Sequence, residues 1–199
     1  MRRQPVSFRT YRPEDLPEIL RIQNANLVAN LSEQEKADGF LLVGFSIQQF
    51  EEIHREIPVV VADLGSRLGG YLCGTSIPYS RGIPLLDHMI GLFQTTRFRG
   101  RTLDRCCVFL YGPVCIDRAM RGQGILEGLH DALLRRVAGR YDVGVLFISR
   151  NNPRSLNAHT RKLGIEPLKE FEFDGAGFTL LAFEVSHPNH SLYFKRVSR

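Results

Sequence analysis

One short segment restricts the fold of this chain more than any other: a glycine-rich turn between an apolar strand and an amphipathic helix. The turn is Arg121-Gly122-Gln123-Gly124-Ile125. Its glycines let backbone N–H groups converge without hindrance from a Cβ atom, and the start of a helix adds partial positive charge. The segment therefore predicts a site for an anionic group such as a pyrophosphate. Glycines are common at helix starts, so the pattern alone does not identify the ligand.

Two other phosphate-binding motifs do not fit this turn. A dinucleotide fingerprint requires a third glycine three residues after the second, but that position is Glu127 and the nearest glycine is Gly128. A P-loop requires Gly-Lys followed by Ser or Thr, which the chain lacks. The turn is therefore neither of these motifs.

The hydrophobic pattern around the turn predicts an α/β domain with a mixed sheet of about seven strands. The expected order is strand, two helices, three strands, helix, strand, helix and two strands. We expect strands at 6–9, 58–62, 70–74, 107–116, 143–149, 170–173 and 178–185. We expect helices from Arg12, from the N-cap Ser46, from the glycine turn to about Val137, and at 153–163 between the N-cap Asn152 and Gly164.

Two regions interrupt this pattern. Residues 76–104 contain two prolines, several glycines and one apolar patch at 85–93, which predicts a short helix within a variable insertion or loop. Gly112-Pro113 breaks the strand at 107–116, and proline inside a strand requires a bulge or a missing ladder bond. A chain of 199 residues is expected to form a single domain, 1–199, with a tail at 187–199.

The composition, with 43% hydrophobic and 24% charged residues, is that of a soluble globular protein. No stretch approaches the roughly 18 to 20 apolar residues of a membrane span, and the N-terminus does not resemble a signal peptide. We therefore expect a cytoplasmic protein with no membrane partner. The net charge of +5 is compatible with nucleic acid, but the basic residues are dispersed, and an anionic cofactor explains them at least as well. No nucleic-acid partner is expected.

The four cysteines have no metal-binding spacing and no disulfide pattern. Each lies in an apolar, strand-like run, where cysteine usually acts as a small buried hydrophobe. Cys115 also lies in the strand that precedes the glycine turn, which leaves a ligand-binding role open. The sequence predicts no metal site.

Two blocks of the sequence resemble the GCN5-related N-acetyltransferase (GNAT) superfamily. The segment from Val114-Cys115-Ile116 through the glycine turn is similar to the acetyl-CoA motif of that family. Asn152-Pro153-Arg154-Ser155-Leu156, leading to Leu163-Gly164-Ile165, is similar to its second motif, in which an asparagine opens a helix. The two blocks occur in the family's order and spacing.

This resemblance implies a fold, a cosubstrate and a site. The sheet would splay between its fourth and fifth strands, and acetyl-CoA would bind there. Val114 and Ile116 would pair with the pantetheine amides, the glycine turn would hold the pyrophosphate, and Asn152 and Ser155 would face the pantetheine arm. The implied cofactor-binding residues are Val114, Cys115, Ile116, Arg121, Gly122, Gln123, Gly124, Ile125, Leu126, Asn152 and Ser155.

The sequence departs from the family at two positions. Leu126 stands where glycine or alanine is usual, and a larger side chain there would narrow the pyrophosphate pocket. The family's acid is commonly a tyrosine seven residues after the asparagine. That position is His159 here, whereas counting back from Gly164 gives Thr160, because the chain carries one extra residue. His159 is the expected catalytic acid. Thr160, or neither residue, remains an alternative. No general base is evident among Tyr111, Asp104, Glu170 and Glu172.

The resulting hypothesis is an acetyl-CoA-dependent N-acetyltransferase in which a primary amine attacks the thioester directly, without an acetyl-enzyme. The acceptor would be a small-molecule or peptide amine. The alternative is a non-catalytic module that binds or senses acyl-CoA, and a nucleic-acid-binding domain is a weaker third reading. The sequence leaves the oligomeric state open, a homodimer included.

Overall fold

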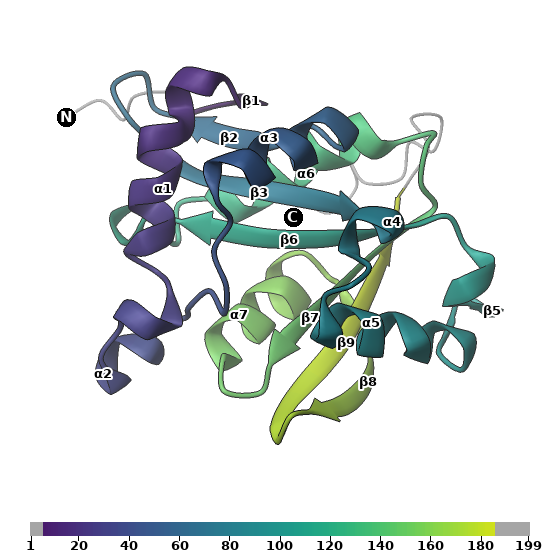
Figure 1. The fold of residues 1–199 in the computed structure, drawn as a ribbon. Coiled ribbons are helices and arrows are strands. Elements are labelled where there is room, and N and C mark those ends of the chain that lie inside the picture. Colours follow the sequence, from purple (N-terminus) through teal and green to yellow (C-terminus); the bar gives the residue numbers. More distant parts are fainter. Residues whose placement is uncertain (1–5, 186–199) are drawn as a thin grey trace, which may run out of the picture.

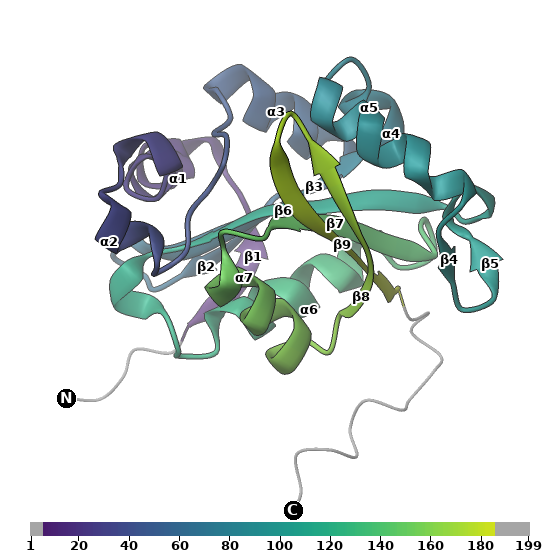
Figure 2. The ribbon, with the colours of Figure 1, turned by 90° about the horizontal axis from the view of Figure 1, so that it is seen from below.

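A computed structural model describes residues 6–185 of the chain, which form a mixed seven-stranded sheet in the order β1-β2-β3-β6-β7-β9-β8. Helices cover both faces: α1, α3, α4 and α5 lie on one side of the sheet, and α6 and α7 on the other (Figures 1 and 2). The sheet strands are β1 (Ser7–Thr10), β2 (Val60–Asp63), β3 (Leu68–Ser76), β6 (Val108–Ile116), β7 (Val143–Ser149), β8 (Glu166–Phe173) and β9 (Ala176–Glu184). The α-helices are α1 (Leu16–Asn24), α2 (Glu33–Lys36), α3 (Ile47–Glu56), α4 (Ile77–Ser80), α5 (Pro84–Gly91), α6 (Ile125–Val137) and α7 (Pro153–Asn157). The predicted α/β class and the number of sheet strands are confirmed.

The first helices form as local rules predict. Ser46 caps α3 through a reciprocal box: its Oγ accepts from the Gln49 N–H at 3.2 Å, and Gln49 Oε1 accepts from the Ser46 N–H at 2.9 Å. The α1 helix follows a 3₁₀ turn at Pro13–Asp15, and its residues Ile19 and Ile22 are buried against the sheet. The sequence did not predict α2, a single turn capped by Ser32.

The sheet opens between β6 and β7. These parallel strands pair only through Val108–Leu110 of β6 and Val143–Val145 of β7. Beyond Leu110, β6 continues beside β3 while β7 continues beside β9. The break coincides with a cis peptide bond at Gly112-Pro113 and with a register shift in the facing part of β3. The predicted splay between the fourth and fifth strands, and the predicted irregularity at the proline, are confirmed.

Helix α6 starts at the glycine turn and packs on the sheet beside this opening. Its predicted apolar face, Leu126, Leu129, Leu133 and Val137, is buried. Leu129, Leu133 and Val137 join a core cluster with residues of β2, β3 and β6. The burial fixes the start of α6 relative to the end of β6, and this positions the glycine turn.

Helix α7 differs from the expected single α-helix at 153–163. It is α-helical over Pro153–Asn157 and then forms a π-helical turn over Ala158–Lys162. A π turn accommodates one inserted residue within a helix. The π turn therefore accommodates the extra residue. Because of that residue, counting from Asn152 gives His159 and counting back from Gly164 gives Thr160.

Residues 76–104 are largely built into secondary structure, where a loop with one short helix was expected. They form α4, α5, a two-stranded hairpin of β4 (Arg97–Phe98) and β5 (Arg101–Thr102), and connecting 3₁₀ turns. Met89 and Phe93 pack into a cluster with β7 and β9. The sequence signal was weak because each of these elements is too short to show periodicity.

The last two strands pair as an antiparallel hairpin. Strand β8 starts four residues earlier than expected, at Glu166, and β9 starts two residues earlier, at Ala176. The turn is the pair Asp174-Gly175, both with positive φ (49° and 72°), as a two-residue hairpin turn requires. The tail predicted at 187–199 lies outside the described residues. Within residues 6–185, no helix is both long enough and apolar enough to cross a bilayer.

The cysteine prediction holds for two of the four residues. Cys73 and Cys115 are buried, and burial raises the pKa of the Cys115 thiol to about 12. Cys107 is exposed, so its expected role as a buried hydrophobe is wrong: it lies just before β6 and its thiol donates to the Arg140 carbonyl at 3.1 Å. Cys106 is half-buried.

A neutral histidine lies in the core between α6 and the sheet. His130 is 8% exposed, packs against the rings of Tyr111 and Phe183, and its Nδ1 has no hydrogen-bond partner. Burial lowers its pKa from 6.5 to about 4, and the neighbouring His159 acts in the same direction. Between these two pH values the unfolded chain binds more protons than the native one, so the free energy of unfolding falls as the pH falls from about 6.5 towards 4.

We therefore predict that His130→Leu flattens this acid-side loss of stability. The shift corresponds to up to about 3 kcal/mol at the acid end of the window. Urea unfolding at about pH 7 and about pH 4.5 should show a smaller drop for the variant than for the natural chain. An equal drop in both proteins would contradict the neutral state of His130.

Candidate functional site

Two clefts meet where β6 and β7 separate. The glycine-turn cleft, with a volume of about 700 Å³, runs from the start of α6 along β6 to α7. The apolar cleft, of about 310 Å³, lies between the segment after α2, helices α4 and α5, and the open ends of β6 and β7. They share part of their walls, made by Phe40, Leu41, Val114, Asn152, Ser155 and His159. A ligand that fills one cleft therefore reaches the other at this junction.

The glycine turn presents a row of unsatisfied backbone donors to its cleft. Gly122 and Gly124 have φ values of 76° and 82°, a region that residues with a Cβ rarely adopt. Within residues 6–185, the N–H groups of 122–126 donate to no acceptor. Convergent N–H groups at a helix start form an anion-binding concavity. The turn therefore has the backbone geometry that an anion site requires.

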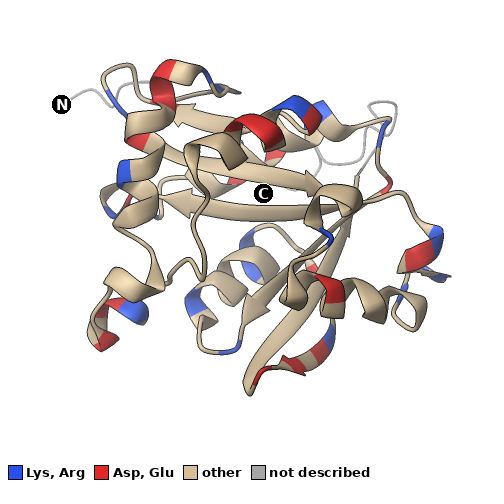
Figure 3. Cartoon of the chain, viewed as in Figure 1, with Lys and Arg blue, Asp and Glu red and all other residues tan. Residues whose placement is uncertain are grey.

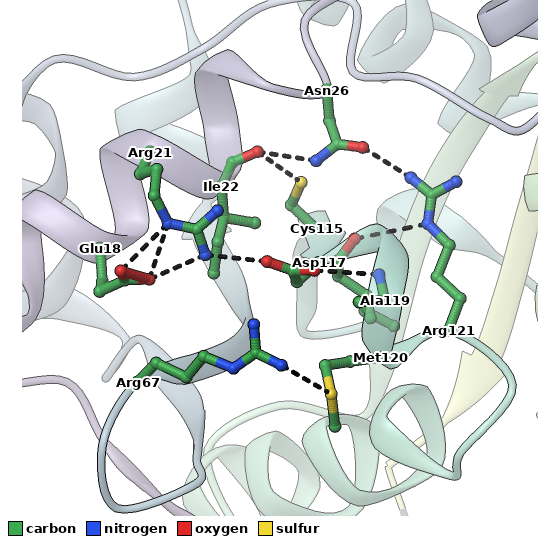
Figure 4. Close-up of polar contacts among 11 residues, drawn as sticks. Glu18, Arg21, Ile22, Asn26, Arg67, Cys115, Asp117, Ala119, Met120 and Arg121 are labelled. Atoms are coloured by element: carbon green, nitrogen blue, oxygen red, sulfur yellow. Dashed lines mark hydrogen bonds and ion pairs between the residues drawn. The ribbon is translucent and has the colours of Figure 1, made fainter.

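Arg121 lies at one end of this cleft, where it contacts neutral oxygen atoms only. It donates to Asn26 Oδ1 at 2.6 Å and to the Ile116 carbonyl at 3.4 Å (Figure 4). It also donates to the Asp38 carbonyl. Burial lowers its pKa, and the positive charge of Arg154 acts in the same direction. Arginine nevertheless stays protonated in proteins. Its charge is therefore not cancelled by a bonded carboxylate and remains directed to whatever anion occupies the cleft.

Further positive charge comes from the α7 side. Arg154, Arg161 and Lys162 line the glycine-turn cleft, and Arg154 pairs with the Asp38 carboxylate. Asp38 and Glu127 are the acidic residues among the described residues that line it. Cations thus outnumber acids along this cleft, which suits a ligand with several phosphates.

The edge of β6 that faces the opening pairs with no strand beyond Leu110. The Asp117 N–H donates to the Gly69 carbonyl of β3, and Cys115 lies opposite Tyr71 of β3. Because hydrogen bonds alternate along an antiparallel strand, the N–H and C=O groups of Val114 and Ile116 point the other way, towards the opening. The Cys115 side chain packs in the cluster under α1, and its thiol lies 3.7 Å from the Ile22 carbonyl (Figure 4).

Asn152 joins two parts of the site. Its Oδ1 accepts from the Ser155 N–H at 3.2 Å, which caps α7, and its Nδ2 donates to the Phe40 carbonyl at 3.0 Å. The side chain is 5% exposed. One amide therefore fixes both the start of α7 and the segment that covers the opening.

His159 forms part of the wall of both clefts and is 3% exposed. Its Nδ1 lies 2.8 Å from the Ser155 carbonyl. A carbonyl only accepts, so Nδ1 carries the proton of the neutral ring and Nε2 is left as an acceptor, with no hydrogen-bond partner in the described part of the chain. Burial lowers the His159 pKa, which favours this neutral form.

The other candidates for proton transfer are less well placed. Thr160 donates its hydroxyl to the Leu156 carbonyl at 2.8 Å. Glu170 and Glu172 are exposed and pair with Arg150, and Asp104 is exposed in a 3₁₀ turn. Tyr111 is buried, and burial raises its pKa far above the usual value, so it stays a neutral phenol. No group of three potential metal ligands occurs within residues 6–185.

The structure brings nearly all of the sequence-predicted site residues to one cleft. Gln123 is the exception, because its side chain turns back to the Ala119 carbonyl at 2.9 Å. Leu126 is buried in the first turn of α6 and lines a cleft that is still large. Sequence reasoning missed the 37–41 segment and the cations of α7. The 37–41 segment lies far from the glycine turn in the chain and no motif marks it, whereas Arg154 lies inside the second motif but its role in the cleft was not predicted.

Comparison with known proteins identifies the fold. No protein-family model matches this chain, and no curated protein sequence matches it. Among solved structures, an N-acetyltransferase from Staphylococcus aureus Mu50 is similar over 92% of this chain and 99% of its own, with a TM-score of 0.60 and 18% identity. A Salmonella typhimurium protein solved with its cofactor acetyl-CoA is similar over 92% and 95%, with a TM-score of 0.56 and 15% identity. A ribosomal-protein-alanine N-acetyltransferase from Brucella melitensis is similar over 89% and 99%, with a TM-score of 0.55 and 18% identity.

The double role of Asn152 gives a prediction about stability. Asn152→Ala removes the α7 cap and the bond to Phe40, and loss of a cap costs about 0.5–2 kcal/mol. Chemical denaturation should show a loss of at least about 1 kcal/mol. Asn151→Ala is the matched control, because the neighbouring Asn151 side chain is exposed. This variant should change stability by less than about 0.5 kcal/mol. Equal losses in the two variants would contradict this role.

Proposed function

From the GNAT acetyltransferase fold that this chain has, we propose that it binds acetyl-CoA in the glycine-turn cleft and transfers the acetyl group to a primary amine. One observation carries the proposal: a single cleft joins the unsatisfied N–H groups of 122–126, the free edge of β6 and the buried ring of His159. Similarity to the solved structures supports the fold.

Successive parts of the cleft match successive parts of coenzyme A. The N–H groups of 122–126 and the charge of Arg121 would bind the pyrophosphate. The backbone of Val114 and Ile116 would pair with the pantetheine amides, because β7 has separated from β6 there and leaves these groups without a partner strand. Ser155 and Asn152 would line the end of the pantetheine arm. The thioester would then lie at the junction with the apolar cleft.

The proposed reaction is direct attack in a ternary complex. The amine nitrogen bonds to the acetyl carbon, the carbon–sulfur bond breaks, the nitrogen loses one proton, and the thiolate takes one up to give CoA and an amide. Holding both reactants at the junction supplies much of the rate, and the Ile116 N–H would polarise the thioester carbonyl.

His159 is the residue that we propose for proton transfer. In its neutral form Nε2 accepts a proton rather than donating one, so the ring would act as acid only after taking up the proton that the amine releases. Its lowered pKa favours passing that proton on to the thiolate. His159, expected from the sequence to be a catalytic acid, would therefore carry a proton from the amine to the thiolate.

A non-catalytic acyl-CoA-binding module is the alternative function. It is favoured by the absence of a carboxylate among the described residues at the junction and by the histidine in place of the family's usual tyrosine. Tight CoA binding together with no turnover on a broad amine panel would select it over the enzyme.

The glycine turn gives a direct test of cofactor binding. We predict that Gly122→Ala and Gly124→Ala each weaken CoA binding by about tenfold or more, because a Cβ at positive φ distorts the N–H groups. Gly139→Ala is the matched control: Gly139 has φ 80°, with open space around its Cβ position, and lies outside both clefts. Isothermal titration with CoA measures the effect. Equal weakening by Gly139→Ala, or none by the other two, would refute the assignment.

The role of His159 is tested by kinetics. His159→Gln should lower kcat by about 100-fold or more, the usual size of a lost acid–base group, and leave the Kd for CoA unchanged. His130→Leu provides the control, since His130 is also buried near Tyr111 but lines neither cleft. Unchanged turnover in His159→Gln would remove His159 from the mechanism.

A further inference from the structure

The apolar cleft has an unusual lining for a site that receives an amine. Its walls are built from aliphatic and aromatic side chains of the 40–45 segment, α5 and the open ends of β6 and β7. Among the described residues that line it, none is Asp, Glu, Lys or Arg. Figure 3 shows that charged residues are also scarce around this cleft. The segment between α2 and α3 and the strands β3 and β6 behind it carry almost no Asp, Glu, Lys or Arg.

Of the hydroxyl groups in the lining, those of Thr75, Tyr79 and Ser80 are hydrogen-bonded within the protein. The buried Tyr111 hydroxyl has no partner among the described residues and carries no charge. Thr75 and Ser80 bond each other at 3.0 Å, and the Ser80 hydroxyl lies 2.8 Å from the Ser76 carbonyl. The Tyr79 hydroxyl donates to Glu52 at 3.4 Å, and Glu52 itself does not line the cleft. No charged partner is thus offered to a substrate cation, and leaving a buried cation unpaired is costly.

The mouth of this cleft is apolar as well. The described residues include four exposed large hydrophobic side chains: Leu42, Val43, Ile47 and Ile83. Three of them, Leu42, Val43 and Ile83, line this cleft, with exposures of 39%, 72% and 42%. Exposed apolar groups gathered around a cavity mark a binding surface. The cleft therefore opens to solvent through a rim that favours an apolar visitor.

We propose that the apolar cleft receives the acceptor, and that the acceptor is a small primary amine on an uncharged, apolar body. The inference rests on the proposed function, because it uses the thioester placed at the junction. A volume of about 310 Å³ is at the lower end of the roughly 300–1,000 Å³ of small-molecule sites. It suits a compact aryl or alkyl amine rather than a folded protein segment.

The lining also explains how such an amine loses its charge without a carboxylate base. An ammonium group that enters a water-poor, uncharged cleft is destabilised relative to the neutral amine. The extra proton therefore stays in the solvent, and the neutral nitrogen reaches the junction with its lone pair free. After attack, the second proton passes from nitrogen to sulfur, and the products are an N-acetyl amide and CoA with its thiol.

A long acyl chain is the competing occupant, because it would extend from the thioester into the same cleft. The solvent-facing rim argues for an acceptor, since a chain delivered from the junction needs no apolar mouth. The full-length protein with acetyl-CoA and with octanoyl-CoA distinguishes the two. Higher kcat/KM with octanoyl-CoA than with acetyl-CoA would assign the cleft to the acyl chain and overturn the inference.

The direct test compares amines by release of the CoA thiol. We expect kcat/KM for 2-phenylethylamine and hexylamine to exceed that for 1,4-diaminobutane and lysine by about 100-fold or more, because the charged bodies find no partner in the cleft. A preference for the charged amines would overturn the inference. CoA binding by titration with no acetylation of any of these amines would overturn it too and support the binding module. No CoA binding would overturn the proposed function itself.

A pair of variants places the preference in this cleft. Ile83→Asp puts a carboxylate on the rim at the N-cap position of α5, which tolerates aspartate. It should reduce the ratio of kcat/KM for 2-phenylethylamine to that for 1,4-diaminobutane by about tenfold or more, since the distal cation gains a partner and the phenyl ring loses apolar contact. Ile47→Asp changes the one exposed large hydrophobe of the described chain that lies outside the cleft and should leave the ratio within about twofold. Equal changes in both variants would overturn the assignment.

Discussion

Between Leu110 and Ile116, strand β6 keeps its pairing with β3 but has no strand on its other side. Unpaired backbone N–H and C=O groups inside a fold are costly unless water or a ligand satisfies them. The opening therefore creates a binding surface from main-chain atoms alone, independent of side-chain identity. Both clefts exist because the sheet separates there, and their common wall is the part of β6, α7 and the 37–41 segment that surrounds the opening.

The 37–41 segment holds the two arms of this opening together. On one side the Leu41 N–H donates to the Asn26 carbonyl, and Asn26 in turn accepts from Arg121. On the other side Phe40 accepts from Asn152, and Asp38 pairs with Arg154. The segment thus connects the end of α1 and the glycine turn with the start of α7. Movement of the glycine turn or of α7 would break hydrogen bonds to the 37–41 segment. The geometry of the junction therefore depends on the glycine turn, α7 and the 37–41 segment together.

The parts of this architecture that sequence could predict are those with local causes. The glycine turn, the Ser46 and Asn152 caps and the apolar stripe of α6 follow from residue type and spacing, and they are where expected. The 37–41 segment could not be predicted, because its bonds join residues about a hundred positions apart and use backbone carbonyls, which leave no trace in side-chain identity. The π turn was visible only as an extra residue in the count, since the sequence does not indicate where a helix absorbs an insertion.

The two clefts differ in charge, and this difference decides which substrate each cleft would bind in the proposed reaction. Backbone donors and cations surround the outer end of the glycine-turn cleft, whereas the described walls of the apolar cleft carry no charge. A phosphate-bearing cosubstrate gains attraction in the first and would lose hydration in the second without compensation. An apolar amine has the opposite preference. In the proposed reaction each substrate would therefore be excluded from the other's cleft by its own solvation, and the reactive groups would meet where the two environments join, beside the ring of His159.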